Sequence, residues 1–251
     1  MRKPLVAGNW KMNGSRSSVA SLLTGIQAGL RETTATVVVC PPFPYLAQVE
    51  TALKGSSIAW GAQNLSTETS GAFTGEVAAS MLLDFGCTYA IVGHSERRAL
   101  YGEDDVLVAR KFEVAVAASL IPILCVGETL AERENGITEQ VVGRQLDAVV
   151  SLVGASQLAV GLIAYEPVWA IGTGKTASPA QAQEVHAFIR QRLVIQDPKV
   201  AAGMRILYGG SVKGDNAAEL FSQPDIDGGL IGGAALKADE FLCICNSVIS
   251  R

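Results

Sequence analysis

The sequence predicts an α/β protein folded as one (β/α)8 barrel, with eight parallel strands surrounded by helices, over residues 1–251. Short apolar runs alternate along the chain with longer segments in which apolar residues recur at helical spacing. Eight such runs divide the chain into units of about 31 residues, the size of one strand-and-helix step. A length of 251 residues is also typical of a closed eightfold barrel.

The predicted strands are short, apolar on both faces or rich in β-branched residues, and bounded by Gly, Pro, Asn or Ser. Strands that are buried on both sides, as in a parallel sheet, have this pattern. In chain order the first half contains a strand at 5–8, a helix at 17–30, strands at 36–40, 58–62 and 89–92, and a helix at 104–118. The second half contains strands at 121–126, 160–165, 205–208 and 228–231, with helices at 139–153, 179–195 and 239–249.

Two of the helices have start signals in the sequence. Ser178 supplies a capping hydroxyl directly before Pro179, which suits the first helical position, and Thr138 precedes another helical run. No linker or change of composition divides the chain, so we expect a single domain. The alternation by itself also fits an open doubly wound sheet, whereas the strand count and the length favour the barrel.

The composition excludes several classes of protein. Hydrophobic residues make up 49% of the chain, and the formal net charge is −4, so the chain lacks the basic surface that binding to nucleic acid needs. No apolar run approaches the roughly 18 residues of a membrane helix, and Asn9 and Lys11 interrupt any secretory core at the start. The five cysteines are scattered without a Cys-x-x-Cys pair. We expect a cytoplasmic protein that binds neither nucleic acid nor a membrane.

Polar and glycine residues stand where the predicted strands end. In a barrel of parallel strands the carboxyl ends meet on one rim, which is where such folds place their chemistry. On this rim we expect Asn9, Lys11, His94, Glu96, Glu166, Ser211, Gly232 and Gly233.

Glu166 is the best candidate for a general base. It directly follows the apolar run that ends at Tyr165, and a partly desolvated carboxylate binds a proton more strongly than a solvated one. The glycine-bearing turns after the last two strands offer free backbone N–H groups, which suit a phosphate. His186, by contrast, lies within a predicted helix, and we assign it a structural role.

Other kinds of site are not supported. The segment 172–176, GTGKT, ends like a nucleotide-binding loop but lacks its earlier glycine, and it starts too far from a strand for a dinucleotide turn. Ser95 and Ser211 each lack the second glycine of a hydrolase elbow. With two distant histidines and no Cys/His cluster, we expect no metal site.

Six stretches of the chain closely resemble the triosephosphate isomerase family, whose fold is the TIM barrel. They run in the family's order from near the start of the chain to near its end. They are GNWKMN at 8–13, GAFTGE at 71–76, VGHSERR at 92–98, AYEPVWAIGTGK at 164–175, YGGSV at 208–212 and GGA at 232–234.

The resemblance implies a homodimer that interconverts dihydroxyacetone phosphate and D-glyceraldehyde 3-phosphate, in glycolysis and gluconeogenesis, without a cofactor or a metal. Glu166 would be the base and His94 the electrophile that also shuttles a proton. Lys11 and Asn9 would stabilise the enediolate and the bound substrate, and Glu96 would hold Lys11. An enediolate needs preorganised positive charge, and a helix start beside His94 would keep its ring neutral.

The resemblance also assigns the rest of the site. Gly172, Ser211, Gly232 and Gly233 would bind the phosphate, and residues 167–176 would form a lid over it. The segment 63–76 would insert into the partner subunit and bring Thr74 near the partner's active site.

Two other functions remain compatible with this reading. One is another phosphate-binding barrel enzyme, such as a sugar-phosphate epimerase, which would use a metal or paired acids. The other is a binding protein without catalysis, since a fold alone does not establish a function.

Overall fold

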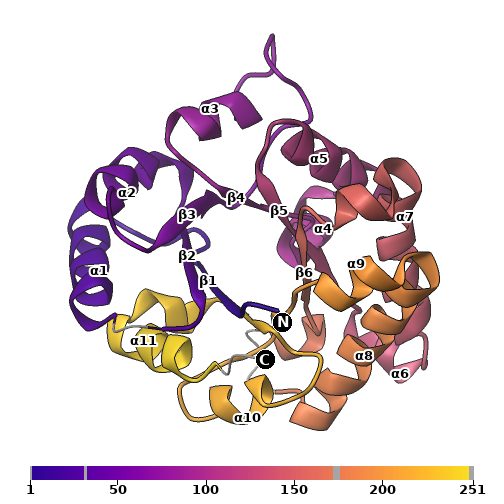
Figure 1. Ribbon diagram of the computed structural model, residues 1–251. Coiled ribbons are helices and arrows are strands. Elements are labelled where there is room, and N and C mark those ends of the chain that lie inside the picture. The colour runs from indigo at the N-terminus through magenta and orange to yellow at the C-terminus, as the bar shows by residue number, and fades with distance from the viewer. Residues whose placement is uncertain (1, 31–32, 172–175, 249–251) are drawn as a thin grey trace.

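The computed structural model describes residues 2–30, 33–171 and 176–248, and Figure 1 shows them as a ring of strands enclosed by helices. Within these residues each strand pairs in parallel with the next along the chain, and β1 pairs with β8, which closes the barrel. The predicted (β/α)8 fold is confirmed, and the open sheet is excluded.

The strands of the barrel lie close to their predicted positions. They are β1 (Leu5–Asn9), β2 (Thr36–Cys40), β3 (Ala59–Ala62), β4 (Tyr89–Val92), β5 (Ile121–Val126), β6 (Leu162–Tyr165), β7 (Ile206–Tyr208) and β8 (Gly228–Ile231). The sixth strand begins at Leu162 and not at residue 160, because the preceding helix continues to Leu158 and a turn follows it.

The helices surround the strands. They are α1 (Arg16–Gly29), α2 (Leu46–Leu53), α3 (Ala79–Asp84), α4 (Ser95–Tyr101), α5 (Asp105–Ala117), α6 (Leu130–Glu134), α7 (Thr138–Leu158), α8 (Pro179–Gln196), α9 (Pro198–Gly203), α10 (Ala217–Phe221) and α11 (Ala238–Asn246), with 3-10 turns η1 (Phe43–Tyr45), η2 (Val168–Ala170) and η3 (Gly233–Leu236). Ser178 caps α8 by accepting the Gln181 N–H, and Pro179 is its first residue, as predicted. None of the helices in the described ranges combines the length and apolarity needed to cross a membrane.

Apolar side chains alternate between two sides of the barrel wall. Leu5 and Ala7 belong to one buried cluster, which gathers alternate residues of the strands, whereas Val6 belongs to the larger cluster that includes the helices. Successive residues of a strand point to opposite faces, so the first cluster fills the barrel and the second lies between strands and helices. This packing fixes both ends of every strand and therefore the position of the residues that follow each strand.

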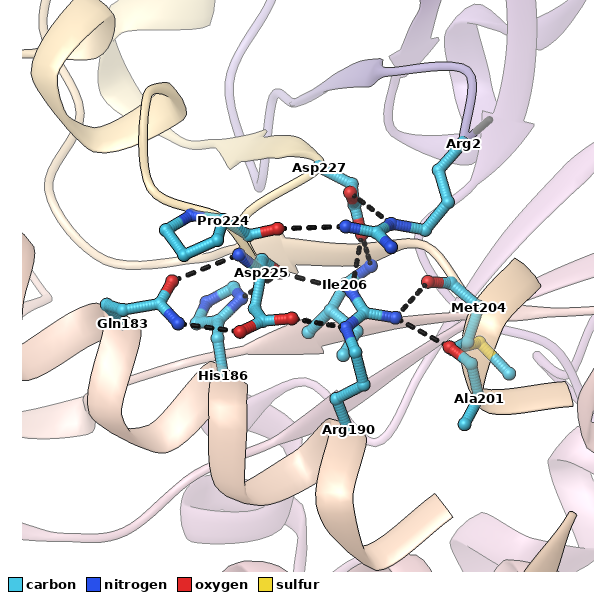
Figure 2. A network of polar contacts seen from close by, with 10 residues as sticks. All are labelled: Arg2, Gln183, His186, Arg190, Ala201, Met204, Ile206, Pro224, Asp225 and Asp227. Carbon is cyan, nitrogen blue, oxygen red and sulfur yellow. Dashed lines mark hydrogen bonds and ion pairs between the residues drawn. The ribbon is translucent and has the colours of Figure 1, made fainter. Parts of the chain in front are cut away.

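At the amino ends of the strands, a network of ion pairs and hydrogen bonds joins the first part of the chain to the last part (Figure 2). The buried carboxylate of Asp227 accepts from Arg2 Nε at 2.7 Å, from Arg190 Nη2 at 2.9 Å and from the Ile206 N–H at 2.9 Å. Arg190 also donates to the carboxylate of Asp225. The network therefore links the amino ends of β1, β7 and β8 to α8, at the end of the barrel opposite the predicted site.

His186 of α8 is a buried neighbour of this network (Figure 2). Its Nδ1 lies 3.2 Å from the carbonyl oxygen of Asp225. Its ring packs edge-on against the ring of Tyr165, with 5.7 Å between the two ring centroids. Burial lowers the pKa of His186 to about 3, because the charged ring would lose its hydration. The ring is therefore neutral in the folded chain at neutral pH.

This burial predicts a loss of stability on mild acidification. Below about pH 6.5 His186 takes up a proton in the unfolded chain but not in the folded one, so the unfolding free energy falls by about 1.4 kcal/mol per pH unit. His94 does not share this effect, because its pKa is raised and folding favours its protonation. Urea unfolding between pH 6.5 and pH 5 measures the slope. The same slope in His186→Gln would contradict this assignment.

Candidate active site

A cavity of about 490 Å³ opens at the carboxyl ends of the strands. Its lining includes residues that follow β1, β4, β6, β7 and β8, which confirms that these strand ends converge. Seven of the predicted site residues line it together: Asn9, Lys11, His94, Glu166, Ser211, Gly232 and Gly233.

A carboxylate and an imidazole face each other in this cavity. Glu166 Oε1 lies 2.9 Å from His94 Nε2, and the side chains are only 2% and 7% exposed. The second carboxylate oxygen of Glu166 accepts the backbone N–H of Ser95 at 2.9 Å. Gly209 lies against the same side chain, since a β-carbon on Gly209 would be 2.9 Å from Glu166 Cγ. Glu166 is thus held on several sides.

The backbone at the start of α4 selects one tautomer of His94. His94 is the N-cap residue of this helix, and its Nδ1 accepts the Glu96 N–H at 3.2 Å. A proton on Nδ1 would oppose that N–H, so the hydrogen of the neutral ring is on Nε2 and is donated to Glu166. The helix start that the sequence predicted beside His94 is present. The expectation that it would disfavour the charged ring is not met, because the Glu166 and Glu96 carboxylates outweigh burial and raise the pKa of His94.

The two groups shift each other's pKa. Burial alone raises the pKa of Glu166, but His94, the Ser95 N–H and the Lys11 ammonium more than offset burial and bring it below its usual value. Burial likewise lowers the pKa of His94, and the Glu166 and Glu96 carboxylates more than offset it and raise that pKa. The expectation that burial would leave Glu166 with a raised proton affinity is therefore wrong for this arrangement, because its hydrogen-bond donors prevail over burial.

Lys11 has an unusual backbone conformation beside this pair. Its φ is 52°, in the left-handed region that costs a side-chain-bearing residue about 1–2 kcal/mol. The Lys11 N–H donates to Asn9 Oδ1 at 3.0 Å, and its carbonyl accepts Gln63 Nε2 at 2.8 Å. Its ammonium reaches Glu96 Oε1 at 2.5 Å. Neighbouring side chains thus hold the strained backbone and the ammonium, and Glu96 contacts Lys11 as expected.

The far side of the cavity is formed by small residues and cations. Ser211 follows β7, and Gly232 and Gly233 lie at the start of η3, where backbone N–H groups have no helical partner. Lys213 and Lys237 are exposed residues that also line the cavity, and the sequence interpretation did not include them. This side is suited to an anion.

Two of the predicted positions are not among the lining residues of this cavity that the structure describes. Gly172, together with 173–175 of the expected lid, lies outside the described residues, so its position is not assigned. Thr74 is exposed in the segment between β3 and α3, and it does not line the cavity. Among the residues described, no group of three His, Cys, Asp or Glu side chains could hold a metal ion.

Glu128 is a buried carboxylate that the sequence interpretation missed. It accepts Trp169 Nε1 at 2.9 Å, the Tyr165 hydroxyl at 3.1 Å and Arg133 Nη1 at 3.2 Å. Its contacts join the end of β5 to the residues on both sides of Glu166. Its place two residues after β5 is the same kind of signal that identified the other site residues.

Comparison with known proteins finds similarity along nearly the whole chain. A family model described as triosephosphate isomerase matches residues 4–248. The triosephosphate isomerase of Thiobacillus denitrificans is 68% identical over 98% of this chain and 99% of the relative. Proteins of the same name from Dechloromonas aromatica and Nitrosococcus oceani are 65% and 62% identical, again over 98% of this chain and 99% of each relative.

Proposed function

The chain belongs to the triosephosphate isomerase family, and from that premise we propose that Glu166 and His94 carry out its proton transfers in the cavity described above. The protein is an isomerase that interconverts dihydroxyacetone phosphate and D-glyceraldehyde 3-phosphate, a step of glycolysis and gluconeogenesis. The assignment of residues to roles is supported above all by one observation, the buried contact between His94 Nε2 and Glu166 Oε1 at 2.9 Å.

Glu166 is the base that removes a proton from the carbon next to the substrate carbonyl. Its lowered pKa means that the carboxylate is ionised and ready to accept a proton. To reach a substrate carbon, the carboxylate of Glu166 must leave its contacts with His94 Nε2 and the Ser95 N–H and approach the C–H group of the substrate. Those donors lower its proton affinity, so their loss in a buried site makes Glu166 a stronger base.

His94 and Lys11 stabilise the negative charge that develops on the substrate oxygens. The Nε2–H of His94 can donate to one oxygen and shuttle a proton between the two, while the ammonium supplies fixed positive charge. The side-chain amide of Asn9 contacts the bound substrate. Its oxygen also accepts the Lys11 N–H, and this hydrogen bond helps to orient Lys11. Glu166 then returns the proton to the neighbouring carbon.

The phosphate of the substrate binds at the other side of the cavity. Backbone N–H groups at Ser211, Gly232 and Gly233 suit its charge and size, and Gly172 would add another from outside the described residues. Binding of this remote group positions the reacting carbons next to Glu166.

Removing the base should abolish fast turnover without abolishing binding. In Glu166→Gln the amide keeps the shape but cannot accept the proton, so kcat should fall by about 10²- to 10⁴-fold. The affinity for glycerol 3-phosphate, which cannot isomerise, should change little.

The assay couples triose-phosphate interconversion to a dehydrogenase, with a chelator present so that a metal-dependent epimerase would be inactive. Glu134→Gln, an exposed carboxylate on α6, is the matched control and should retain full activity. Near-normal turnover in Glu166→Gln would exclude Glu166 as the base.

We further propose that residues 1–251 form one domain that assembles as a homodimer. Figure 1 shows that the segment between β3 and α3 extends beyond the ring of helices. This segment contains Thr74 and Phe73, whose apolar ring is 46% exposed. Apolar side chains that remain exposed on a projecting segment favour contact with another protein surface.

Sedimentation equilibrium tests the assembly. The chain should sediment at twice its own mass, and Phe73→Glu should shift it to the monomer, because the interface would have to bury a charge. Ile195→Glu places the same charge on α8, where the side chain is 79% exposed, and should leave the dimer intact. A monomeric wild-type chain would contradict the proposal.

The remaining proposals concern partners and location. The family match supports a small phosphorylated triose as the partner, and the net charge of −4 argues against a nucleic acid or an anionic membrane surface. The five cysteines lie among the described residues and are free, which supports a reducing, cytoplasmic location. Fractionation of cells should recover the isomerase activity in the cytosol, and recovery elsewhere would contradict this location.

A further inference from the structure

We infer that Gln145, on the outer helix α7, is a positioning residue for catalysis, because its amide clamps Gly127 against the backbone of Glu166. The inference rests on the proposed role of Glu166 as the base. Gln145 does not line the substrate cavity, so its effect passes through the backbone.

Both hydrogen bonds of the Gln145 amide that the described residues form are made to Gly127. Oε1 accepts the Gly127 N–H at 2.8 Å, and Nε2 donates to the Gly127 carbonyl at 3.1 Å. Gln145 is 5% exposed on a helix face that also buries Val142, Leu146 and Val149. A buried amide is costly unless it is hydrogen-bonded, so these two bonds fix both the side chain and residue 127.

Gly127 needs such a partner because of its place in the fold. It follows the last residue of β5, where the chain leaves the sheet and its strand pairing ends. The side chain of Gln145 replaces the missing strand neighbour with a donor and an acceptor. Figure 1 shows α7 on the outer ring, so the clamp reaches inward from a helix to the rim of the barrel.

The clamped segment lies directly against the base. A β-carbon on residue 127 would be 1.8 Å from the carbonyl oxygen of Glu166, so the two backbones touch with no space between them. The neighbours of Gly127 add two bonds: the Glu166 N–H donates to the Val126 carbonyl at 2.7 Å, and the Val168 N–H donates to the Glu128 carbonyl at 3.1 Å. Residues 126–128 therefore support the backbone of 166–168.

A loosened clamp would displace this support. Proton transfer depends steeply on the distance between base and carbon, and a displacement of about 1 Å can lower a rate by about 10²-fold. The phosphate side of the cavity, at Ser211 and Gly232, follows β7 and β8, whereas the hydrogen bonds of the clamp are made to the residue that follows β5. Loss of Gln145 should therefore lower kcat and leave KM nearly unchanged.

The test replaces the amide with an apolar group of similar length. Gln145→Met should lower kcat by about 10- to 100-fold with KM unchanged within about threefold. The acid limb of the kcat/KM profile should move to higher pH, because a less firmly held Glu166 loses part of the contact with His94 and Ser95 that lowers its pKa. Gln145→Glu keeps the acceptor for the Gly127 N–H but turns a second acceptor toward the Gly127 carbonyl, so it should lose at least as much activity as the Met variant. Gln140→Met, exposed on the same helix, is the matched control and should behave as wild type.

Several results would overturn the inference. A wild-type kcat and acid limb in Gln145→Met, with only the unfolding midpoint lowered, would show that the clamp serves stability alone. A raised KM with unchanged kcat would show that Gln145 supports substrate binding and not the position of the base. Failure of both Gln145 variants to fold would show that its role is structural. Glu166→Gln, assayed in parallel, separates the two proposals: if it is inactive while Gln145→Met is normal, the positioning role fails and the base assignment stands. If Glu166→Gln is active, the base assignment fails.

Discussion

The contact between His94 Nε2 and Glu166 Oε1 is the constraint on which the site depends. His94 follows β4 and Glu166 follows β6, and these two strands are not neighbours, because β5 lies between them. A closed barrel brings the two strand ends onto one rim, and backbone N–H groups then orient each side chain. The Ser95 N–H binds the carboxylate, and the Glu96 N–H binds the imidazole. The start of one short helix therefore determines the geometry of both groups.

The two ends of the barrel serve different needs. At the amino ends of the strands, Asp227 and Arg190 satisfy one another's charges and join distant parts of the chain. At the carboxyl ends, Lys11 has a strained backbone, and in the proposed mechanism Glu166 gives up hydrogen bonds to reach a substrate. Strain and replaceable contacts are tolerable at the active site because the rest of the barrel is packed and paired.

Much of this arrangement could be predicted from the sequence, because buried strands and the polar residues that end them leave a periodic pattern. Asn9, His94 and Glu166 were found in that way. The contributions of Gln145 and Gln63 could not be found, since an amide that binds backbone groups across the fold has no local signature. The proton affinity of Glu166 was also misjudged, because burial can be inferred from neighbouring residues, whereas donors such as the Ser95 N–H come from another strand.

In the proposed mechanism a carboxylate removes a proton from one carbon and returns it to the next. The most direct measurement follows dihydroxyacetone phosphate in D₂O and determines by NMR how much deuterium the product carries at its second carbon. A proton held on Glu166 can exchange with solvent before it is returned, so part of the product should contain deuterium there. A product without solvent deuterium, combined with unchanged turnover in Glu166→Gln, would mean that hydrogen passes directly between the carbons as a hydride, and the proposed roles of Glu166 and His94 would be wrong.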